Sequence, residues 1–375
     1  MAQKKIKILF TIPNFDTAGS GKVVYDLVNN LDKRFFEPEI CCYHDGGAFF
    51  KEVEALHVKI HLFPFAINYR PFLTFPFRLI NTIRFFRKHN FDLIHSWHWS
   101  SDFSEPLAAK LAGIPWIYTK KSMGWGNKAW RWRTALSSKI ITINLDMKSF
   151  YSVKALEKVE EIPLGVDTNY YTPRTKEDIT LLKDLDIKTS DFVIVSVVNL
   201  IPVKGIEVLI KAVVALDKPN IKLLIVGHDK GDYACSLKKM TERISSIQFL
   251  GKKADVRPYH AIADVFVIPT LELGEGLPVA PLEAMASGKI VIGSNVSGVK
   301  DILNPFQNCL FEPNNVESLK DSILSILNMS TEECIQLGKA MRTRVETNYS
   351  IERFIKSHTD LYKGICSKNQ DKHVE

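Results

Sequence analysis

The sequence predicts an α/β protein made of two domains, each with a parallel sheet. Short apolar segments alternate with amphipathic segments of helical spacing, which is typical of parallel strands covered by helices. At 375 residues the chain is too long for one ordinary core. The alternation lapses once, near 163–190, and then begins again, so a domain boundary is expected there.

The first half contains the first set of alternating segments. Val24, Leu27, Val28 and Leu31 recur at helical spacing, for example. Strands are expected at 6–13, 38–44, 58–64, 91–97, 114–120, 139–144 and 159–165, and helices at 21–31, 76–89 and 104–113.

The second half repeats this organisation. Strands are expected at 192–200, 221–227, 247–251, 263–270 and 289–294, and helices at 205–216, 232–244, 281–287, 316–327, 332–348 and 350–365. We assign 1–167 to the first domain, 168–349 to the second, and 350–375 to a final helical segment. Ligands of such sheets bind at the carboxyl ends of the strands, so two domains would place a cleft between these ends.

Composition narrows the classes of function. The net charge of +7 suits an anionic substrate or an anionic membrane surface, and no run of like charges indicates nucleic-acid binding. Six scattered cysteines without a CxxC pair favour a reduced, cytoplasmic compartment. No His, Cys or carboxylate group has the spacing of metal ligands, and Asp184 and Asp186 are interpreted as surface charge, so no metal site is expected.

Two glycine-containing loops are candidates for anion binding. Gly19 and Gly21 do not complete a P-loop or a dinucleotide fingerprint, because Asp16, Val23 and Val24 occupy required positions. The remaining Gly-Ser-Gly segment is predicted to be a flexible turn that either contacts a ligand or is a plain tight turn. Lys204 ends the loop after the 192–200 strand and either reaches a phosphate or is a surface lysine.

The strongest motif is "GEGLPVAPLEAMASG" at 274–288. Its glycines free the backbone, and Pro278 and Pro281 suit the first turn of a helix. We therefore expect Glu275 to precede the helix and Glu283 to lie within it. A carboxylate pair that shares a proton needs near contact, so this spacing better fits two contacts with one extended ligand.

These segments resemble glycosyltransferase family 4, whose members are retaining enzymes of the GT-B fold. Glu275 and Glu283 match the family's Glu-x7-Glu element, and "IPLGVD", "VKG", "LIHSW" and "LAGIPWIYT" resemble other family blocks. The resemblance covers nearly the whole chain. It implies two Rossmann-like domains facing across a central cleft, with the last helix crossing back to the first domain.

The resemblance also implies roles for individual residues. Glu275 would contact the donor sugar, Glu283 the ribose, and Lys204 the diphosphate, with Glu275 and Lys204 as the catalytic pair. The donor would also meet Gly19, Gly21, Asn199 and the backbone of Gly276, Leu277, Pro278 and Val279. A nucleotide-diphospho-sugar would be the co-substrate, without any other cofactor or a metal.

The sequence departs from the family pattern in two places. An arginine is common at the position of Asn199, and Lys252, Lys253 or Arg257 are alternatives for the missing charge. On the acceptor side a family histidine is replaced by Lys121, and the candidates are His95, His98 and Lys121. We expect Lys120 and Lys121 to meet an anionic acceptor or the donor phosphates, the rival interpretation being a pair of solvated lysines.

Two aromatic segments bear on the acceptor. Residues 72–89 either lie on a membrane surface or form an ordinary helix with one buried face. Residues 123–139, with Trp125, Trp130 and Trp132, are either a platform for sugar or lipid or a packed helix with snorkelling arginines. Both segments raise the prospect of a lipid-linked acceptor and of peripheral contact with the inner face of an anionic membrane.

The function expected is therefore retaining transfer of a hexose-type sugar, from a UDP-sugar in preference, to a hydroxyl acceptor. Bacterial surface polysaccharide, lipopolysaccharide or glycolipid biosynthesis would be the setting, with a saccharide or lipid-linked saccharide as acceptor. The alternatives are a nucleotide-sugar epimerase and a non-catalytic sugar-nucleotide-binding protein of the same fold.

Overall fold

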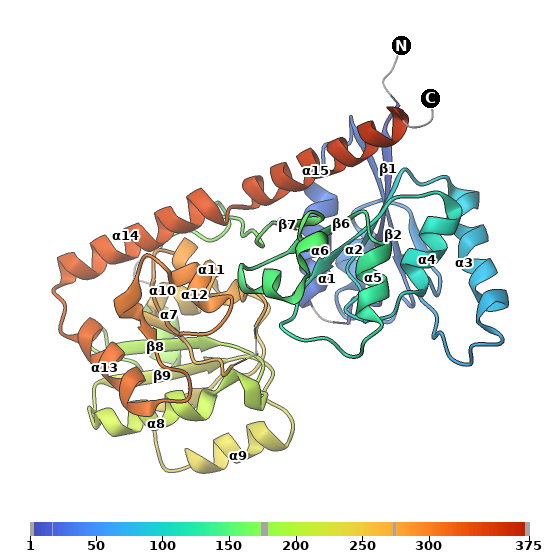
Figure 1. Cartoon of the computed structure of the whole chain (residues 1–375). Helices are drawn as coiled ribbons and strands as arrows, with labels where there is room; N and C mark the ends of the chain where they lie inside the picture. Colours follow the sequence, from blue (N-terminus) through green and yellow to red (C-terminus); the bar gives the residue numbers. More distant parts are fainter. Residues whose placement is uncertain (1–3, 17, 174–178, 273–274, 372–375) are drawn as a thin grey trace. The chain divides into compact units, whose positions relative to one another are not determined.

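The computed structural model describes residues 4–16, 18–173, 179–272 and 275–371 (Figure 1). The chain divides into two compact units, which we describe separately. Unit 1 comprises Met1–Pro163 and Arg353–Glu375, and unit 2 comprises Leu164–Glu352. The chain thus passes from unit 1 to unit 2 four residues before the expected boundary after residue 167, and it returns to unit 1 at Arg353.

Unit 1 is built on a seven-stranded parallel sheet in the order β3-β2-β1-β4-β5-β6-β7. The strands are β1 (Ile6–Thr11), β2 (Phe36–Cys42), β3 (Ile60–Leu62), β4 (Leu93–Ser96), β5 (Trp116–Lys120), β6 (Lys139–Thr142) and β7 (Val159–Glu161). The helices are α1 (Ala18–Asn30), α2 (Phe50–Glu54), α3 (Phe75–His89), α4 (Ser104–Ala112), α5 (Trp130–Leu136), α6 (Val153–Leu156) and the 3-10 helix η1 (Asp146–Phe150). The C-terminal helix α15 (Ile351–Asp371) contributes most of its length to this unit.

Both faces of the unit 1 sheet are apolar, as expected for parallel strands covered on both sides. One face, with Leu9, Ile94 and Trp116, packs against α3 and α4 in one buried cluster. On the other face Phe10 meets the Tyr362 ring of α15 at a centroid distance of 6.2 Å. Helix α15 is therefore an integral part of the unit 1 core.

Unit 2 repeats the plan with a six-stranded parallel sheet in the order β10-β9-β8-β11-β12-β13. Helix α8 packs against α13 and α11 against α14, on opposite faces of the sheet (Figure 1). The strands are β8 (Phe192–Val197), β9 (Ile221–Val226), β10 (Ile247–Phe249), β11 (Val265–Ile268), β12 (Ile290–Ser294) and β13 (Leu310–Phe311). The helices are α7 (Ile179–Asp184), η2 (Pro202–Lys204), α8 (Ile206–Leu216), α9 (Asp232–Met240), α10 (Arg257–Ile262), α11 (Val279–Ala286), α12 (Val299–Leu303), η3 (Gln307–Cys309), α13 (Val316–Leu327) and α14 (Thr331–Asn348).

The predicted α/β class with two parallel sheets is confirmed, and one local prediction is wrong. Gly19 and Gly21 do not form a flexible turn, because α1 begins at Ala18 and includes both. Gly21 is buried, and a Cβ atom at this position would lie 3.0 Å from the Phe15 ring. Close packing between helix and loop therefore accounts for this glycine.

Candidate functional site

The strand order of unit 2 creates a switch point between β8 and β11. The sheet grows from β8 to one side through β9 and β10, and to the other through β11, β12 and β13. Ligands of open α/β sheets bind outside the carboxyl ends of the strands at such a point. The segments that follow β8 and β11 carry most of the predicted donor residues.

An ion pair joins these two segments. Lys204 ends η2 after β8, and its Nζ contacts Oε1 of Glu275, which follows β11. The Thr270 hydroxyl donates a longer hydrogen bond, 3.3 Å, to the same oxygen. The side chains of Lys204 and Glu275 are 18% and 12% exposed, so the pair is largely withdrawn from water yet remains reachable.

Gly205 fixes the position of Lys204. It has a φ of +64°, and a Cβ atom would lie 2.1 Å from the carbonyl oxygen of Pro269. Only glycine combines this left-handed conformation with such a close approach. The loop after β8 is thereby held against the end of β11, which brings the ammonium group to Glu275.

Helix α11 begins at Val279, directly after Pro278, and Pro281 lies in its first turn. Pro278 is the N-cap, so Glu275 precedes the helix and Glu283 lies within it, as predicted. Gly276 and Leu277 are buried, whereas Val279 is partly exposed in the first turn. Amides at a helix N-terminus lack intrahelical acceptors and carry partial positive charge, which favours an anion.

Two contacts that the sequence did not reveal hold this motif. The Tyr171 hydroxyl donates a 2.8 Å hydrogen bond to Oε1 of Glu283, and burial followed by the Glu283 charge raises the pKa of Tyr171. Gly298, with a φ of +79°, would place a Cβ atom 2.3 Å from the Gly276 carbonyl oxygen. No sequence pattern signals either contact, because each joins residues far apart in the chain.

The residues considered as replacements for the family arginine have different surroundings. Asn199 is exposed in the loop after β8. Arg257 donates to Asp255 and stacks on the Tyr170 ring at 3.9 Å. Lys252 and Lys253 are exposed. Of these cationic side chains, Arg257 thus already has a carboxylate partner.

In unit 1, His95 is a core residue. It is fully buried on β4, and its Nδ1 and Nε2 atoms lie 2.6 Å from the Tyr362 hydroxyl and 2.8 Å from the Thr119 hydroxyl. Burial holds the pKa of His95 well below its usual value. Both ring nitrogens therefore have protein partners in place of the expected acceptor.

His98 lies on the wall of a cavity of about 580 Å³ beyond the end of β4. Tyr43, Arg70 and Asp102 also line this cavity. Burial, followed by the charges of Arg133 and Lys121, lowers the pKa of His98 to about 3, so the imidazole is neutral at physiological pH. Of the acceptor-side candidates, His98 thus borders a cavity, whereas His95 is buried in the core.

Lys121 lies close to the chain segment that carries His98. Its Nζ donates a 2.5 Å hydrogen bond to the Trp97 carbonyl oxygen and lies 5.2 Å from the Trp99 ring centroid. Burial and the Arg133 charge lower the pKa of Lys121 to about 7. The Lys121 ammonium group is therefore shielded from water, which argues against the interpretation as a solvated lysine.

A buried polar network supports this end of unit 1 and was missed by sequence reasoning. Glu105 accepts hydrogen bonds from Thr11 at 2.5 Å and Ser96 at 2.7 Å, at the ends of β1 and β4. Arg133 is 1% exposed and donates to the carbonyl oxygens of His98 and Asp102. The network fixes the backbone of the 97–102 loop.

The tryptophans of the second aromatic segment differ in environment. Trp125 and Trp130 stack at 4.8 Å and belong to the partly buried shell of the core cluster, whereas Trp132 is 65% exposed. The packed-helix interpretation therefore fits Trp125 and Trp130.

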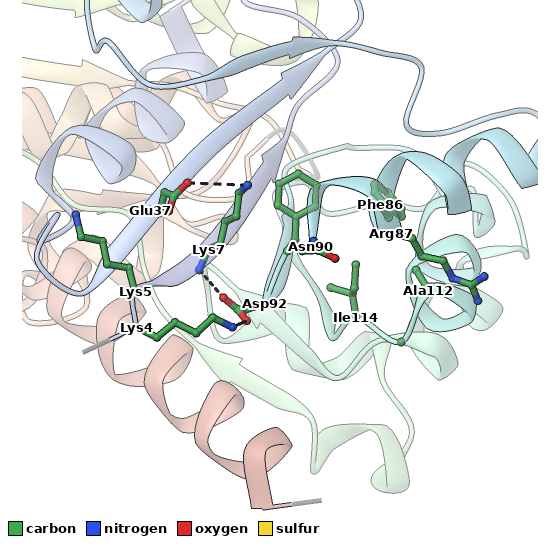
Figure 2. Close-up of a pocket in the computed structure, with 12 residues that line it drawn as sticks. Lys4, Lys5, Lys7, Glu37, Phe86, Arg87, Asn90, Asp92, Ala112 and Ile114 are labelled. Atoms are coloured by element: carbon green, nitrogen blue, oxygen red, sulfur yellow. Dashed lines mark hydrogen bonds and ion pairs between the residues drawn. The ribbon is translucent and has the colours of Figure 1, made fainter. Parts of the chain in front are cut away.

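A second cavity of unit 1, about 780 Å³, lies at the amino ends of β1, β4 and β5 (Figure 2). Two of its lysines, Lys4 and Lys7, pair with carboxylates. Lys4 pairs with Asp92 at 3.1 Å, and Lys7 lies 3.9 Å from Glu37. Its position at the amino ends and this pairing make it a poor site for an anionic substrate.

Two family models match the chain. The model described as "Glycosyltransferase Family 4" matches residues 17–170, and the model "Glycosyl transferases group 1" matches residues 178–344. The chain therefore belongs to the glycosyltransferases of family 4 type, with the GT-B fold of two Rossmann-like domains.

Several characterised proteins are similar to the chain. A GDP-mannose-dependent monoacylated alpha-(1-6)-phosphatidylinositol monomannoside mannosyltransferase of Corynebacterium glutamicum is 32% identical over 52% of this chain and about half, 53%, of its own length. The UDP-Gal:alpha-D-GlcNAc-diphosphoundecaprenol alpha-1,3-galactosyltransferase of Escherichia coli is 24% identical over 76% of this chain and 78% of its own.

Solved structures share the fold. A glycosyltransferase from Rickettsia africae superposes with a TM-score of 0.85 at 20% identity, covering 97% of this chain and 99% of that one. Anabaena HepE in complex with UDP and glucose gives 0.80 at 19% identity, covering 96% and 99%.

Proposed function

We propose that the protein transfers a sugar from a nucleotide-diphospho-sugar, with a UDP-sugar favoured, to a hydroxyl acceptor with retention at the anomeric carbon. The observation that carries this proposal is the Lys204–Glu275 ion pair at the β8/β11 switch point, next to the N-terminus of α11. Cationic and amide donors at this position suit a leaving group that develops negative charge.

In this reaction the bond between the anomeric carbon and the diphosphate oxygen breaks as the acceptor oxygen bonds to that carbon. The acceptor proton passes to an oxygen of the leaving phosphate. Lys204 and the amides at the start of α11 neutralise the diphosphate, and Glu275 contacts the sugar. Glu283, held by Tyr171, accepts hydrogen bonds from the ribose hydroxyls. The residues would need neither a metal nor another cofactor.

The nucleotide base is tested by thermal-shift measurements with UDP, GDP and ADP and with their sugars. Relatives named for UDP-galactose and for GDP-mannose both support a nucleotide-sugar donor. We expect the largest shift with a UDP-sugar. A shift with NAD and none with these nucleotides would overturn the proposal.

The roles of the two glutamates are tested by substitution. Glu283→Ala should mainly weaken nucleotide binding, because it removes the ribose acceptor. Glu275→Ala should mainly lower turnover, because its partner is the reacting sugar. Identical kinetic profiles for the two variants would contradict this division.

Two rival functions on the same fold are a nucleotide-sugar epimerase and a non-catalytic sugar-nucleotide-binding protein. We keep both as alternatives because Asn199, which is exposed, stands where an arginine is common in the family. Incubation with a labelled donor separates all three. Transfer or slow hydrolysis supports the transferase, formation of an epimer identifies an epimerase, and binding without turnover identifies a non-catalytic protein.

We further propose bacterial surface polysaccharide or glycolipid biosynthesis as the setting, with a saccharide or lipid-linked saccharide acceptor and peripheral contact with an anionic membrane. Relatives named for phosphatidylinositol mannoside and diphosphoundecaprenol substrates support this acceptor class. Among the described residues, no helix is both long and apolar enough to cross a bilayer.

An exposed apolar surface at the start of α3 supports membrane contact. Phe72, Leu73 and Phe77 are 64%, 91% and 74% exposed, and the exposed Arg84 and Lys88 follow on the same helix. Apolar side chains beside cations suit an anionic bilayer surface. The protein should co-float with anionic liposomes and lose this behaviour when the three apolar residues are replaced by serine. Absence of co-flotation by the unaltered protein would refute the membrane contact.

A further inference from the structure

Three side chains at one edge of the unit 1 sheet form a cluster of potential metal ligands. Glu39 lies on β2, His61 on the neighbouring β3, and His89 in the last turn of α3. One ligand atom from each residue lies within 4.8 Å of the others. Sequence spacing gave no hint of this group, because its members come together only through strand pairing and helix packing.

We propose that this cluster binds a divalent transition metal, with Zn²⁺ as the favoured ion. Two imidazoles and one carboxylate form a donor set typical of zinc, with a fourth position open to water. At Zn–N and Zn–O distances of about 2.0–2.1 Å, tetrahedral ligand atoms stand roughly 3.3 Å apart. Small side-chain movements reach this geometry, because Glu39 Oε2 and His61 Nε2 are 2.5 Å apart and the His89 ring is close by.

The surroundings hold two of the ligands in place. Glu39 is 3% exposed, which keeps its carboxylate in a fixed orientation on β2. The His61 ring packs edge-to-face against Phe85 at 5.2 Å and His89 at 4.6 Å. His89 is partly exposed, so an ion can enter from solvent.

Lys7 is the main competitor of the metal. Its Nζ lies 3.0 Å from Glu39 Oε1, whereas His61 faces Oε2 of the same carboxylate. The ammonium and the ion would therefore use different oxygens, but their like charges repel. Figure 2 shows Lys7 projecting toward Glu37, which also lies on β2. Removing this charge should strengthen metal binding.

The position of the cluster indicates a stabilising role, separate from the proposed transferase reaction. His89 precedes β4, whereas His98 and its cavity follow the carboxyl end of that strand. A bound ion would join β2, β3 and the end of α3. Because such an ion binds the folded chain only, it should raise the unfolding temperature and leave turnover unchanged.

The test uses the full chain without an affinity tag, stripped of metal and titrated with Zn²⁺ against a chelator. The wild-type protein should bind one equivalent of Zn²⁺ and should unfold at a higher temperature when zinc is present. His61→Gln and His89→Gln should each bind at least about tenfold more weakly, and Lys7→Met should bind more tightly. His57→Asn is the matched control, because it removes an exposed imidazole at a φ of +52° that asparagine tolerates.

Spectroscopy gives an independent measure of the ligands. Co²⁺ at a tetrahedral site with imidazole ligands should give visible absorption bands that disappear in His61→Gln and persist in His57→Asn. Failure of wild type to bind Zn²⁺, or equal affinity in wild type and His61→Gln, would overturn the proposal. Either result would leave the transferase reaction untouched, because that reaction is measured separately by release of nucleotide from the donor.

Discussion

Lys204→Met tests the candidate donor site most directly. The substitution removes the ammonium group and keeps most of the apolar side chain. In the structure this ammonium pairs with Glu275, and the two side chains are 18% and 12% exposed. A charge held in advance in such a shielded position stabilises a developing anion more strongly than the same charge in water. Loss of one such group lowers turnover by about 10²–10³, or roughly 3–4 kcal/mol.

The assay measures release of nucleotide from the donor in the presence of a soluble acceptor. Lys211→Met is the control, because Lys211 is exposed on α8 of the same unit and its loss changes the net charge equally. We expect the control to stay within about twofold of wild type, as for most surface substitutions. Thermal unfolding of both variants separates loss of folding from loss of turnover. If the two variants differ in turnover by less than about tenfold, the role of Lys204 is refuted.

Three further predictions follow from particular contacts. Tyr171→Phe should weaken nucleotide binding by about 1–2 kcal/mol in calorimetry, because Glu283 loses a charge-assisted hydrogen bond; unchanged affinity would exclude a positioning role. Gly205→Ala should destabilise the protein by roughly 3 kcal/mol in urea unfolding, because a Cβ atom would meet the Pro269 carbonyl oxygen at 2.1 Å and the φ is +64°; a change near zero would contradict this. Burial lowers the pKa of His358 to about 4. As the pH falls, this histidine is therefore protonated in the unfolded chain before it is protonated in the folded protein. The free energy of unfolding should therefore decline by up to about 3 kcal/mol between about pH 6.5 and 4, with a weaker decline in His358→Phe; equal slopes would refute this assignment.

The fold was predictable where hydrophobic periodicity is strong. The 316–327 helix, for example, was expected with the bounds found for α13. Short elements such as α10 and α12 escaped, because a helix of one or two turns shows too little of a repeat. The Gly19–Gly21 error has another cause. Glycine disfavours helix interiors, but here close packing against Phe15 overrides that preference.

The site was predictable only in part, for a different physical reason. The motif placed Glu275 before a helix and Glu283 inside it, since proline and glycine chemistry is local. The contacts of Tyr171 and Gly298 depend on tertiary packing, so no local pattern contains them. His95 shows the same limit: a histidine in a short apolar strand can point to an open edge or into a core, and the Tyr362 hydroxyl decides in favour of the core.

The two units show why topology alone does not locate a reactive site. In both parallel sheets the strand order reverses at a switch point, between β1 and β4 in one unit and between β8 and β11 in the other, and a glutamate lies near each switch point. Glu105 is fully buried and accepts hydrogen bonds from Thr11 and Ser96, and burial raises its pKa. Glu275 is instead paired with a partly exposed lysine beside a helix N-terminus. A ligand can take the place of one partner in the Lys204–Glu275 pair at small cost. A ligand that contacted Glu105 would instead have to break a network of satisfied hydrogen bonds in the core. Burial and pairing, more than the strand order, therefore support the proposal that the donor binds in unit 2.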